Sequence, residues 1–169
     1  MSDKEFKELA TTDELTGLLL RNEGLSFVEK QMEFASLNSI KLVIAFIDIN
    51  NLKYVNDKFG HGEGDLLIKS VVEIITKVAR TSDFIFRFGG DEFIIVYDNK
   101  TKSEVEKLFI ETILPSFDNL IINEEALDIK VSFSYGITSY PEDAMNYEKL
   151  MVKADQLMYS NKRAFHLQK

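Results

Sequence analysis

Two runs of aromatic and branched residues flank a glycine-rich turn in the middle of the chain. The runs are Phe84-Ile85-Phe86-Arg87-Phe88 and Phe93-Ile94-Ile95-Val96-Tyr97, and Gly89-Gly90-Asp91-Glu92 lies between them. Such runs are typical of β-strands, and paired glycines favour a tight connection between two antiparallel strands. The sequence therefore predicts a β-hairpin with two acidic residues at its tip.

The other elements follow from hydrophobic periodicity. Residues 41–48 form a continuous apolar run rich in branched side chains, which indicates a strand buried on both faces. Apolar residues recur at helical spacing over 21–37 and 66–78, and these segments are predicted to be helices. Two more helices are predicted at 102–114 and 147–165, and one more strand at 129–137.

The order of these elements is strand, helix, strand, strand, helix, strand. In a split βαβ arrangement, the first strand and the first hairpin strand run parallel, and the second hairpin strand lies between them. Asp48 ends the first strand, and Asp91 and Glu92 lie at the hairpin tip. We therefore expect these three carboxylates to converge at one edge of the sheet.

Composition narrows the class of protein. The 169 residues, 45% of them hydrophobic and 28% charged, suit one domain that could be a piece of a larger signalling protein. A net charge of -8 argues against nucleic-acid binding. The absence of cysteine and of a long apolar run favours a cytoplasmic domain without direct membrane contact, although a parent protein could be tethered to the membrane.

The expected carboxylate edge has the chemistry of a divalent-cation site. Mg²⁺ prefers oxygen ligands and usually takes one or two carboxylates, which Asp48 and Asp91 would supply. Two simpler interpretations stay open at this point: an Asp after a buried strand often only opens a turn, and Gly89-Gly90-Asp91-Glu92 alone could be only a loop. The two glycines permit close approach of a ligand in either case.

Several ordered motifs resemble one family. Phe46 to Asp65, including Asn56 and Gly60-His61-Gly62-Glu63-Gly64-Asp65, is similar to the corresponding stretch of the GGDEF diguanylate cyclase family, as are Asp13 to Leu18, Ser134 to Ile137 and Ala154 to Tyr159. The resemblance covers about residues 11 to 165. It implies an α+β fold with a central, mostly antiparallel five-stranded sheet on a βαββαβ core, ferredoxin-like and similar to nucleotidyl cyclases and polymerase palms, surrounded by helices.

The resemblance also implies ligands for each part of the site. Asp48, Asp91 and the Ile49 carbonyl would bind two Mg²⁺ or Mn²⁺ ions. Asn56 and Asp65 would contact guanine, with His61 lining the same pocket. A carboxylate accepts hydrogen bonds from guanine N1–H and its amino group, which favours GTP over ATP. The simpler interpretation of Asp65 is a helix N-terminal residue that complements the dipole, and the two roles are compatible.

The implied reaction condenses two GTP molecules into cyclic di-GMP and two pyrophosphates. The 3′-hydroxyl of one GTP attacks the α-phosphorus of another, so two sites must face each other in a homodimer. Asp91 and Glu92 are the catalytic candidates, with Glu92 assisting deprotonation or positioning a metal ion, although Glu92 could equally be a solvated turn residue. Lys53 and Lys162 are candidates for neutralising phosphate charge, although lone lysines are often only solvated.

A second motif and several departures complete the resemblance. Arg80-Thr81-Ser82-Asp83 matches the family's product-inhibition motif, so cyclic di-GMP is expected to bind at Arg80 and Asp83; the alternative is a surface ion pair. His166 stands where an Arg is usual, which weakens phosphate contact. Asn22, Asn50 and Leu52 also depart from the family's common residues.

Rival functions are a non-catalytic GTP or cyclic di-GMP receptor and another nucleotidyl cyclase or polymerase-like enzyme. A receptor is expected to lose the hairpin carboxylates, and this chain keeps them. The other enzymes would not predict Asp65 or the Arg80 motif. A sensory or regulatory domain is expected in the parent protein, whether the chain is a diguanylate cyclase or a receptor.

Overall fold

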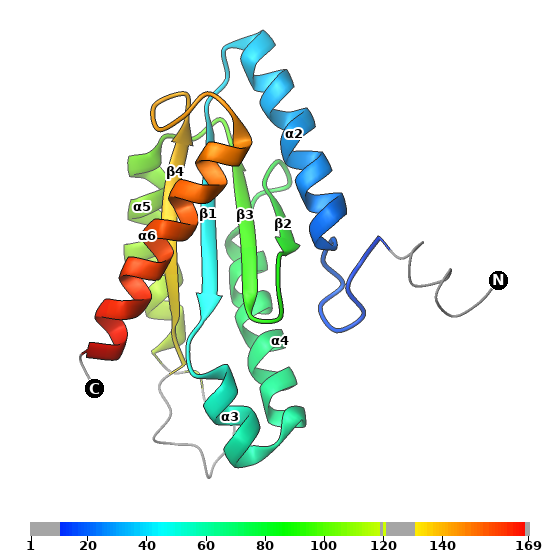
Figure 1. The fold of residues 1–169 in the computed structure, drawn as a ribbon, viewed down its shortest axis with the longest axis vertical. Coiled ribbons are helices and arrows are strands. Elements are labelled where there is room, and N and C mark those ends of the chain that lie inside the picture. The colour runs from blue at the N-terminus through cyan, green and yellow to red at the C-terminus, as the bar shows by residue number, and fades with distance from the viewer. Residues whose placement is uncertain (1–10, 119, 121–130, 168–169) are drawn as a thin grey trace, which may run out of the picture.

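The structure, a computed structural model, describes residues 11–118, 120 and 131–167. In chain order its elements are α2 (Arg21–Asn38), β1 (Leu42–Ile49), α3 (Leu52–Phe59), α4 (His61–Val78), β2 (Phe84–Arg87), β3 (Glu92–Asp98), α5 (Lys102–Leu108), β4 (Phe133–Tyr140) and α6 (Tyr147–Leu167). The strands form one sheet with helices on both of its faces (Figure 1).

The sheet has the order β2-β3-β1-β4, and all neighbouring strands are antiparallel. β3 is inserted between β1 and β2, so β1 and β2 run parallel as the split βαβ arrangement predicts. The α+β class and the mostly antiparallel sheet are confirmed, but the described residues form four strands where five were expected. The predicted strand start at 129 lies outside the described residues, and within them β4 begins at Phe133 and extends to Tyr140.

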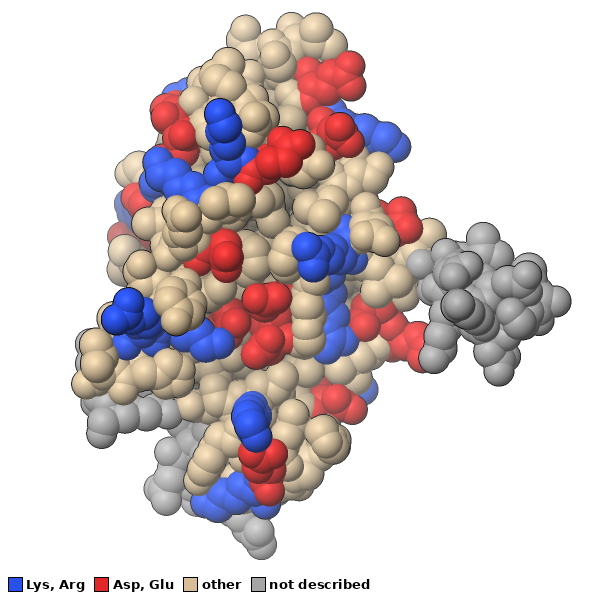
Figure 2. Space-filling model, in the orientation of Figure 1, with Lys and Arg blue, Asp and Glu red and all other residues tan. Residues whose placement is uncertain are grey.

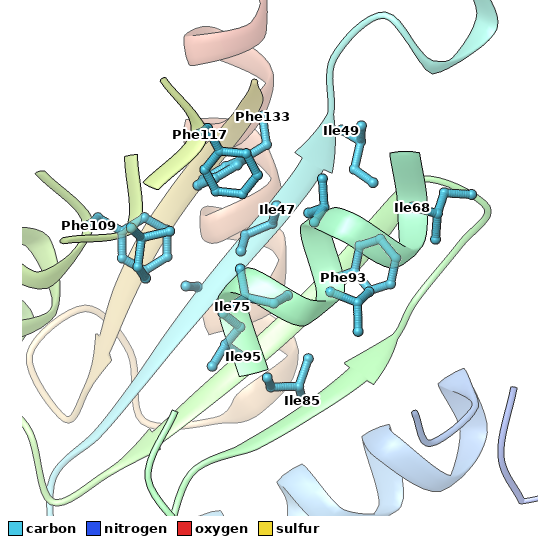
Figure 3. Packing of buried hydrophobic residues seen from close by; sticks show 14 of the residues in the cluster. Ile47, Ile49, Ile68, Ile75, Ile85, Phe93, Ile95, Phe109, Phe117 and Phe133 are labelled. Carbon is cyan, nitrogen blue, oxygen red and sulfur yellow. The ribbon is translucent and has the colours of Figure 1, made fainter. Parts of the chain in front are cut away.

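A hydrophobic core lies on each face of the sheet, and β1 is buried along its whole length between them. Ile47 and Phe93 point into the core under α4 and α5, where Phe109 also packs (Figure 3). The neighbouring residues Phe46 and Ile94 point to the opposite core, beneath α2 and α6. This alternation follows from the two-residue period of a strand, and it explains why β1 carries a continuous apolar run.

Three helices, α3, α4 and α5, differ from the prediction. α3 was expected to be a polar connection, and α4 begins at His61 instead of 66. The predicted helix at 102–114 is α-helical only to Leu108. It continues as a π-helical turn over Phe109–Ile113 and as a 3-10 helix over Leu114–Phe117. The buried face of α4 comprises Leu67, Ile68, Val71, Val72 and Ile75, whereas Leu66 is exposed.

α6 lies directly against β4 at Gly136. A Cβ atom at this position would overlap the Ala154 carbonyl oxygen and lie 2.6 Å from the Met158 backbone nitrogen. The close approach therefore requires glycine and brings the helix backbone down onto the sheet. None of the helices within the described residues is long and apolar enough to cross a membrane.

Candidate active site

Three carboxylates lie near one another where β1 ends and the hairpin turns, and the charge of Asp91 acts on both Asp48 and Glu92. Asp48 pairs with Glu92 across the β1–β3 ladder, so both side chains lie on the α6 side of the sheet. The Ile49 amide donates a hydrogen bond to the Asp91 carbonyl at 2.9 Å, which joins the turn to the end of β1. The convergence expected from the topology is therefore present, and acidic side chains gather beside basic ones near the middle of this face in Figure 2.

Asp48 is buried in the floor of the site, with only 5% of the residue exposed. The Lys162 Nζ of α6 donates to its Oδ1 at 2.6 Å. Burial and the negative charges of Asp91 and Asp155 raise the pKa of Asp48, and the Lys162 contact only partly offsets them. A buried carboxylate with excess negative charge around it is a strong attractor for a cation.

Asp155 is a member of the acidic cluster that the sequence analysis missed. It is exposed on α6, and its charge acts on both Asp48 and Glu92. Asp155 precedes Lys162 by seven residues, which is about two helical turns, so both lie on the same helix face. The seven-residue spacing from Lys162 is the sequence signal that could have identified Asp155, provided that α6 is known to lie over the end of β1.

Glu92 packs back onto the turn that carries it. A Cβ atom at Gly89 would overlap its Oε2, which places the carboxylate directly over the backbone of the turn. Burial raises the pKa of Glu92, as do the charges of Asp48, Asp91 and Asp155, while Lys162 opposes them. Glu92 therefore holds its proton to higher pH than a free glutamate, which suits a group that exchanges protons.

The raised pKa of Glu92 predicts an effect on stability. The folded state binds the Glu92 proton more tightly than the unfolded state does, so protonated Glu92 stabilises the fold. This contribution is complete below pH 4.5, the usual pKa of glutamate, and is lost as pH rises through the folded pKa. At neutral pH Glu92→Gln should therefore raise the melting temperature, and the gain should shrink toward acid. Melting curves with EDTA from about pH 5 to pH 8 would measure this difference.

The control for that measurement is Glu73→Gln. Glu73 is exposed, and the Lys77 hydrogen bond lowers its pKa, so its neutralisation should lower the melting temperature or leave it unchanged at neutral pH. A Glu92→Gln variant that melts below the wild type at pH 7 and above it in acid would contradict the assignment.

A pocket of about 420 Å³ opens beside the carboxylates. It joins several predicted residues from distant parts of the chain, and its lining comprises Ile49, Asn51, Leu52, Lys53, Tyr54, Asp57, Asp91, Lys162 and His166. Lys162 points into the acidic cluster, whereas Lys53 is an exposed residue that pairs with Asp57 at 2.6 Å. The pocket thus brings Asp91 and Lys162 together with His166, the residue that stands in place of an Arg.

The predicted guanine contacts lie apart from this lining, at the junction of α3 and α4. Asn56 is half-buried on α3, and His61 and Asp65 are exposed in the first two turns of α4. A Cβ atom at Gly64 would overlap the Asn56 Oδ1, so the glycine lets the two helices approach at this point. Asp65 lies in the second helical turn, which weakens the simpler interpretation that it serves the helix dipole.

Asn50 links the end of β1 to β4. It is almost fully buried, its Nδ2 donates to Ser132 Oγ at 3.1 Å, and its Oδ1 accepts from Ser134 Oγ at 2.9 Å. A carboxamide can make both bonds because it donates and accepts, whereas an ionised Asp only accepts. Asn50, which differs from the residue that is common in the family, therefore has a structural role next to Asp48.

Arg80 and Asp83 lie at the opposite end of the hairpin strands. The Asp83 side chain is 1% exposed, and its oxygens accept from the Arg80 guanidinium at 2.8 and 3.1 Å and from the Asp98 amide at 3.2 Å. These bonds outweigh burial and lower the pKa of Asp83. The Arg80 side chain is 45% exposed, so the guanidinium presents the outer surface of this pair.

The oxygen donors of the carboxylate edge fit a magnesium-type ion. Within residues 11–118, 120 and 131–167, no three His, Cys, Asp or Glu side chains lie close enough to hold a metal ion. Mg²⁺ at nucleotide sites usually takes one or two carboxylates and completes its shell with water and phosphate oxygens. Asp48 and Asp91 meet that requirement, and the Ile49 carbonyl is the adjacent backbone oxygen.

The sheet order, the acidic hairpin and the flanking helices define a palm-like α+β domain. Residues 10–166 match the family described as diguanylate cyclase, GGDEF domain, and the chain belongs to this family. The GGDEF domain of DgcB from Caulobacter crescentus, solved in complex with c-di-GMP, superposes with a TM-score of 0.82 and 27% identity, covering 92% of this chain and 91% of that chain.

Curated relatives from two other bacteria are similar over almost the whole chain. Diguanylate cyclase A of Treponema denticola is 29% identical over 166 residues, which cover 96% of this chain and 44% of that protein. Diguanylate cyclase DgcP of Pseudomonas aeruginosa is 30% identical over 161 residues, covering 95% of this chain and 24% of that protein. The chain thus spans less than half the length of these relatives.

Proposed function

We propose that this chain condenses two GTP molecules into cyclic di-GMP and releases two pyrophosphates. The observation that carries the proposal is the meeting of Asp48, Asp91 and Glu92 beside the Lys162 ammonium. Two carboxylates for metal ions and a cation for phosphate are the parts that phosphoryl transfer requires.

In this proposal Asp48, Asp91 and the Ile49 carbonyl hold two Mg²⁺ or Mn²⁺ ions. When bound, the ions lower the pKa of the attacking 3′-hydroxyl and neutralise the phosphates. Glu92 accepts or relays a proton at its carboxylate, for which its raised pKa is suited.

Substrate contacts come from the pocket and from the α3–α4 junction. Lys162 reaches the triphosphate by exchanging its Asp48 partner for a phosphate oxygen, and Lys53 adds charge at the pocket rim. Asn56, His61 and Asp65 recognise guanine. Gly89 and Gly90 let the substrate approach the turn closely.

Each site binds one GTP, so catalysis requires a homodimer in which two sites face each other. The test incubates the 169-residue chain with GTP and Mg²⁺ at several protein concentrations and identifies products by chromatography. The initial rate should rise more steeply than protein concentration. A constant rate per molecule in an obligate monomer would refute the two-site mechanism, and GTP binding without cyclic di-GMP would favour a receptor domain of a larger regulator.

Product inhibition is proposed at Arg80 and Asp83. The exposed Arg80 guanidinium binds the cyclic dinucleotide, and the buried Asp83 carboxylate orients that guanidinium. Arg80→Ala should weaken cyclic di-GMP binding about tenfold or more, because a planar donor fork is lost. Arg80→Lys keeps a cation beside buried Asp83 and separates loss of binding from loss of stability. Titration calorimetry measures the affinity, and undiminished binding in both variants would rule the site out.

A further inference from the structure

Arg87, the last residue of β2, spreads its guanidinium over the hairpin turn. Its Nε donates to the Gly89 carbonyl at 3.2 Å and its Nη2 to the Gly90 carbonyl at 2.6 Å. Its Nη1 lies 2.9 Å from each carboxylate oxygen of Asp13. Every nitrogen of the guanidinium therefore has an acceptor, and two of these acceptors are backbone carbonyls of the turn that carries Asp91.

Asp13 is fixed by its own turn. Its Oδ2 also accepts from the Thr16 amide at 2.9 Å and from Thr16 Oγ1 at 2.6 Å, and its backbone bonds to Gly17 and Leu18. Asp13 and Arg87 side chains are both only 16% exposed. Hydrogen bonds from Thr16 and Arg87 outweigh burial and lower the pKa of Asp13, so the pair stays ionised at neutral pH.

The same N-terminal segment contacts the hairpin at two further points. The Arg87 amide donates to the Leu19 carbonyl at 2.9 Å, and Leu19 forms a parallel bridge with Phe86. The Arg21 guanidinium lies over the Phe88 ring, 4.0 Å from its centroid. Asp13, Leu19 and Arg21 thus all contact the hairpin where β2 leads into the turn.

Within the turn, the Phe88 and Gly89 amides both donate to the Glu92 carbonyl, at 2.8 and 3.2 Å, whereas the Gly89 and Gly90 carbonyls are held from outside by Arg87. Gly89 and Gly90 lack Cβ atoms and therefore have wide backbone freedom. On the side of β1 the turn is held by the Ile49–Asp91 hydrogen bond, and on the other side by Arg87. Loss of Arg87 would free the Gly89 and Gly90 carbonyls while the bonds to the Glu92 carbonyl remain, and the Asp91 carboxylate that follows these glycines would gain freedom relative to Asp48.

We propose that Asp13 and Arg87 form a positioning pair that fixes the Gly89–Gly90 backbone and so places Asp91 opposite Asp48. The catalytic consequence rests on the proposed cyclase function. The pair touches neither substrate nor metal, so it acts through Asp91. It also makes the turn's geometry depend on a segment more than 70 positions earlier in the chain.

The test replaces Arg87 with Lys and, separately, Asp13 with Asn. A lysine ammonium can still pair with Asp13, but it lacks the planar fork that holds two carbonyls and a carboxylate together. Amide hydrogen exchange of residues 88–92 should quicken about tenfold in Arg87→Lys, while exchange in β1 and α4 stays protected. With GTP and saturating Mg²⁺, kcat should fall about tenfold with KM for GTP changed less than about twofold.

Asp13→Asn should shift both readouts in the same direction and by less, because the amide keeps the shape and loses the charge. The matched control is Arg163→Lys, the same exchange at an exposed position of α6. Unchanged hairpin exchange, or quickened exchange across the whole chain, would overturn the proposal. A wild-type chain that makes no cyclic di-GMP would refute the proposed function alone, since the exchange measurement still tests the pair.

Discussion

Asp91→Asn should lower kcat for cyclic di-GMP formation at least about 1,000-fold, because it removes one of the two carboxylates that would hold the metal ions. Asn has nearly the same shape, so the turn and its bonds to Ile49 and Arg87 should survive. The measurement is single-turnover product formation followed by chromatography, with melting temperature as a check on folding.

The control for Asp91→Asn is Glu73→Gln, which removes one negative charge from an exposed position on α4 and should leave turnover unchanged. Retention of more than about a tenth of wild-type turnover by Asp91→Asn would show that the carboxylate is not required. In that case Asp48 and Glu92 would be the acids on which turnover depends.

The second large effect concerns stability. Gly136→Ala should destabilise the fold by about 3 kcal/mol, because the added Cβ meets the backbone of α6, which cannot rotate away as a side chain can. For a chain of this size that corresponds to a fall in melting temperature of about 10 °C. Thermal and urea unfolding would measure it, and Gly136→Val should be worse.

Gly62→Ala is the matched control because no atom lies within 4 Å of the Cβ position there. Gly62 lies within α4, so alanine should be neutral or stabilise by up to about 1 kcal/mol. Equal melting temperatures for Gly136→Ala and wild type would mean that α6 can lift from β4 at little cost. In that case Lys162 would not be held firmly over Asp48.

The sheet and the acidic edge were predictable because their signals are local. The branched run of β1 and the aromatic runs flanking the glycines each indicate a strand without reference to the rest of the chain. The convergence of Asp48 with Asp91 then follows from one topological rule. α3 was missed because only Val55 of its residues is buried, so a polar helix was taken for a connection.

The remaining parts of the site depend on contacts between distant residues. Asp155 joins the cluster only because α6 crosses the end of β1, and the pairing of Arg87 with Asp13 spans almost half the chain. The burial of Asp83 was also hidden, since its hydrogen bonds with Arg80 and Asp98 depend on how β2 and β3 end. Periodicity reports which face of an element is buried, and it carries no information on which polar partners meet there.

The pairing of Asp48 with Glu92 also limits how this domain can vary in length. Because side chains alternate between faces, deleting or inserting one residue between Leu42 and Asp48 would turn the carboxylate toward the core that holds Ile47 and Phe93. A register shift of one residue in this strand of eight residues would thus bury a charged carboxylate in the core and remove it from the site. Natural insertions in such domains are therefore expected in the loops and never within β1.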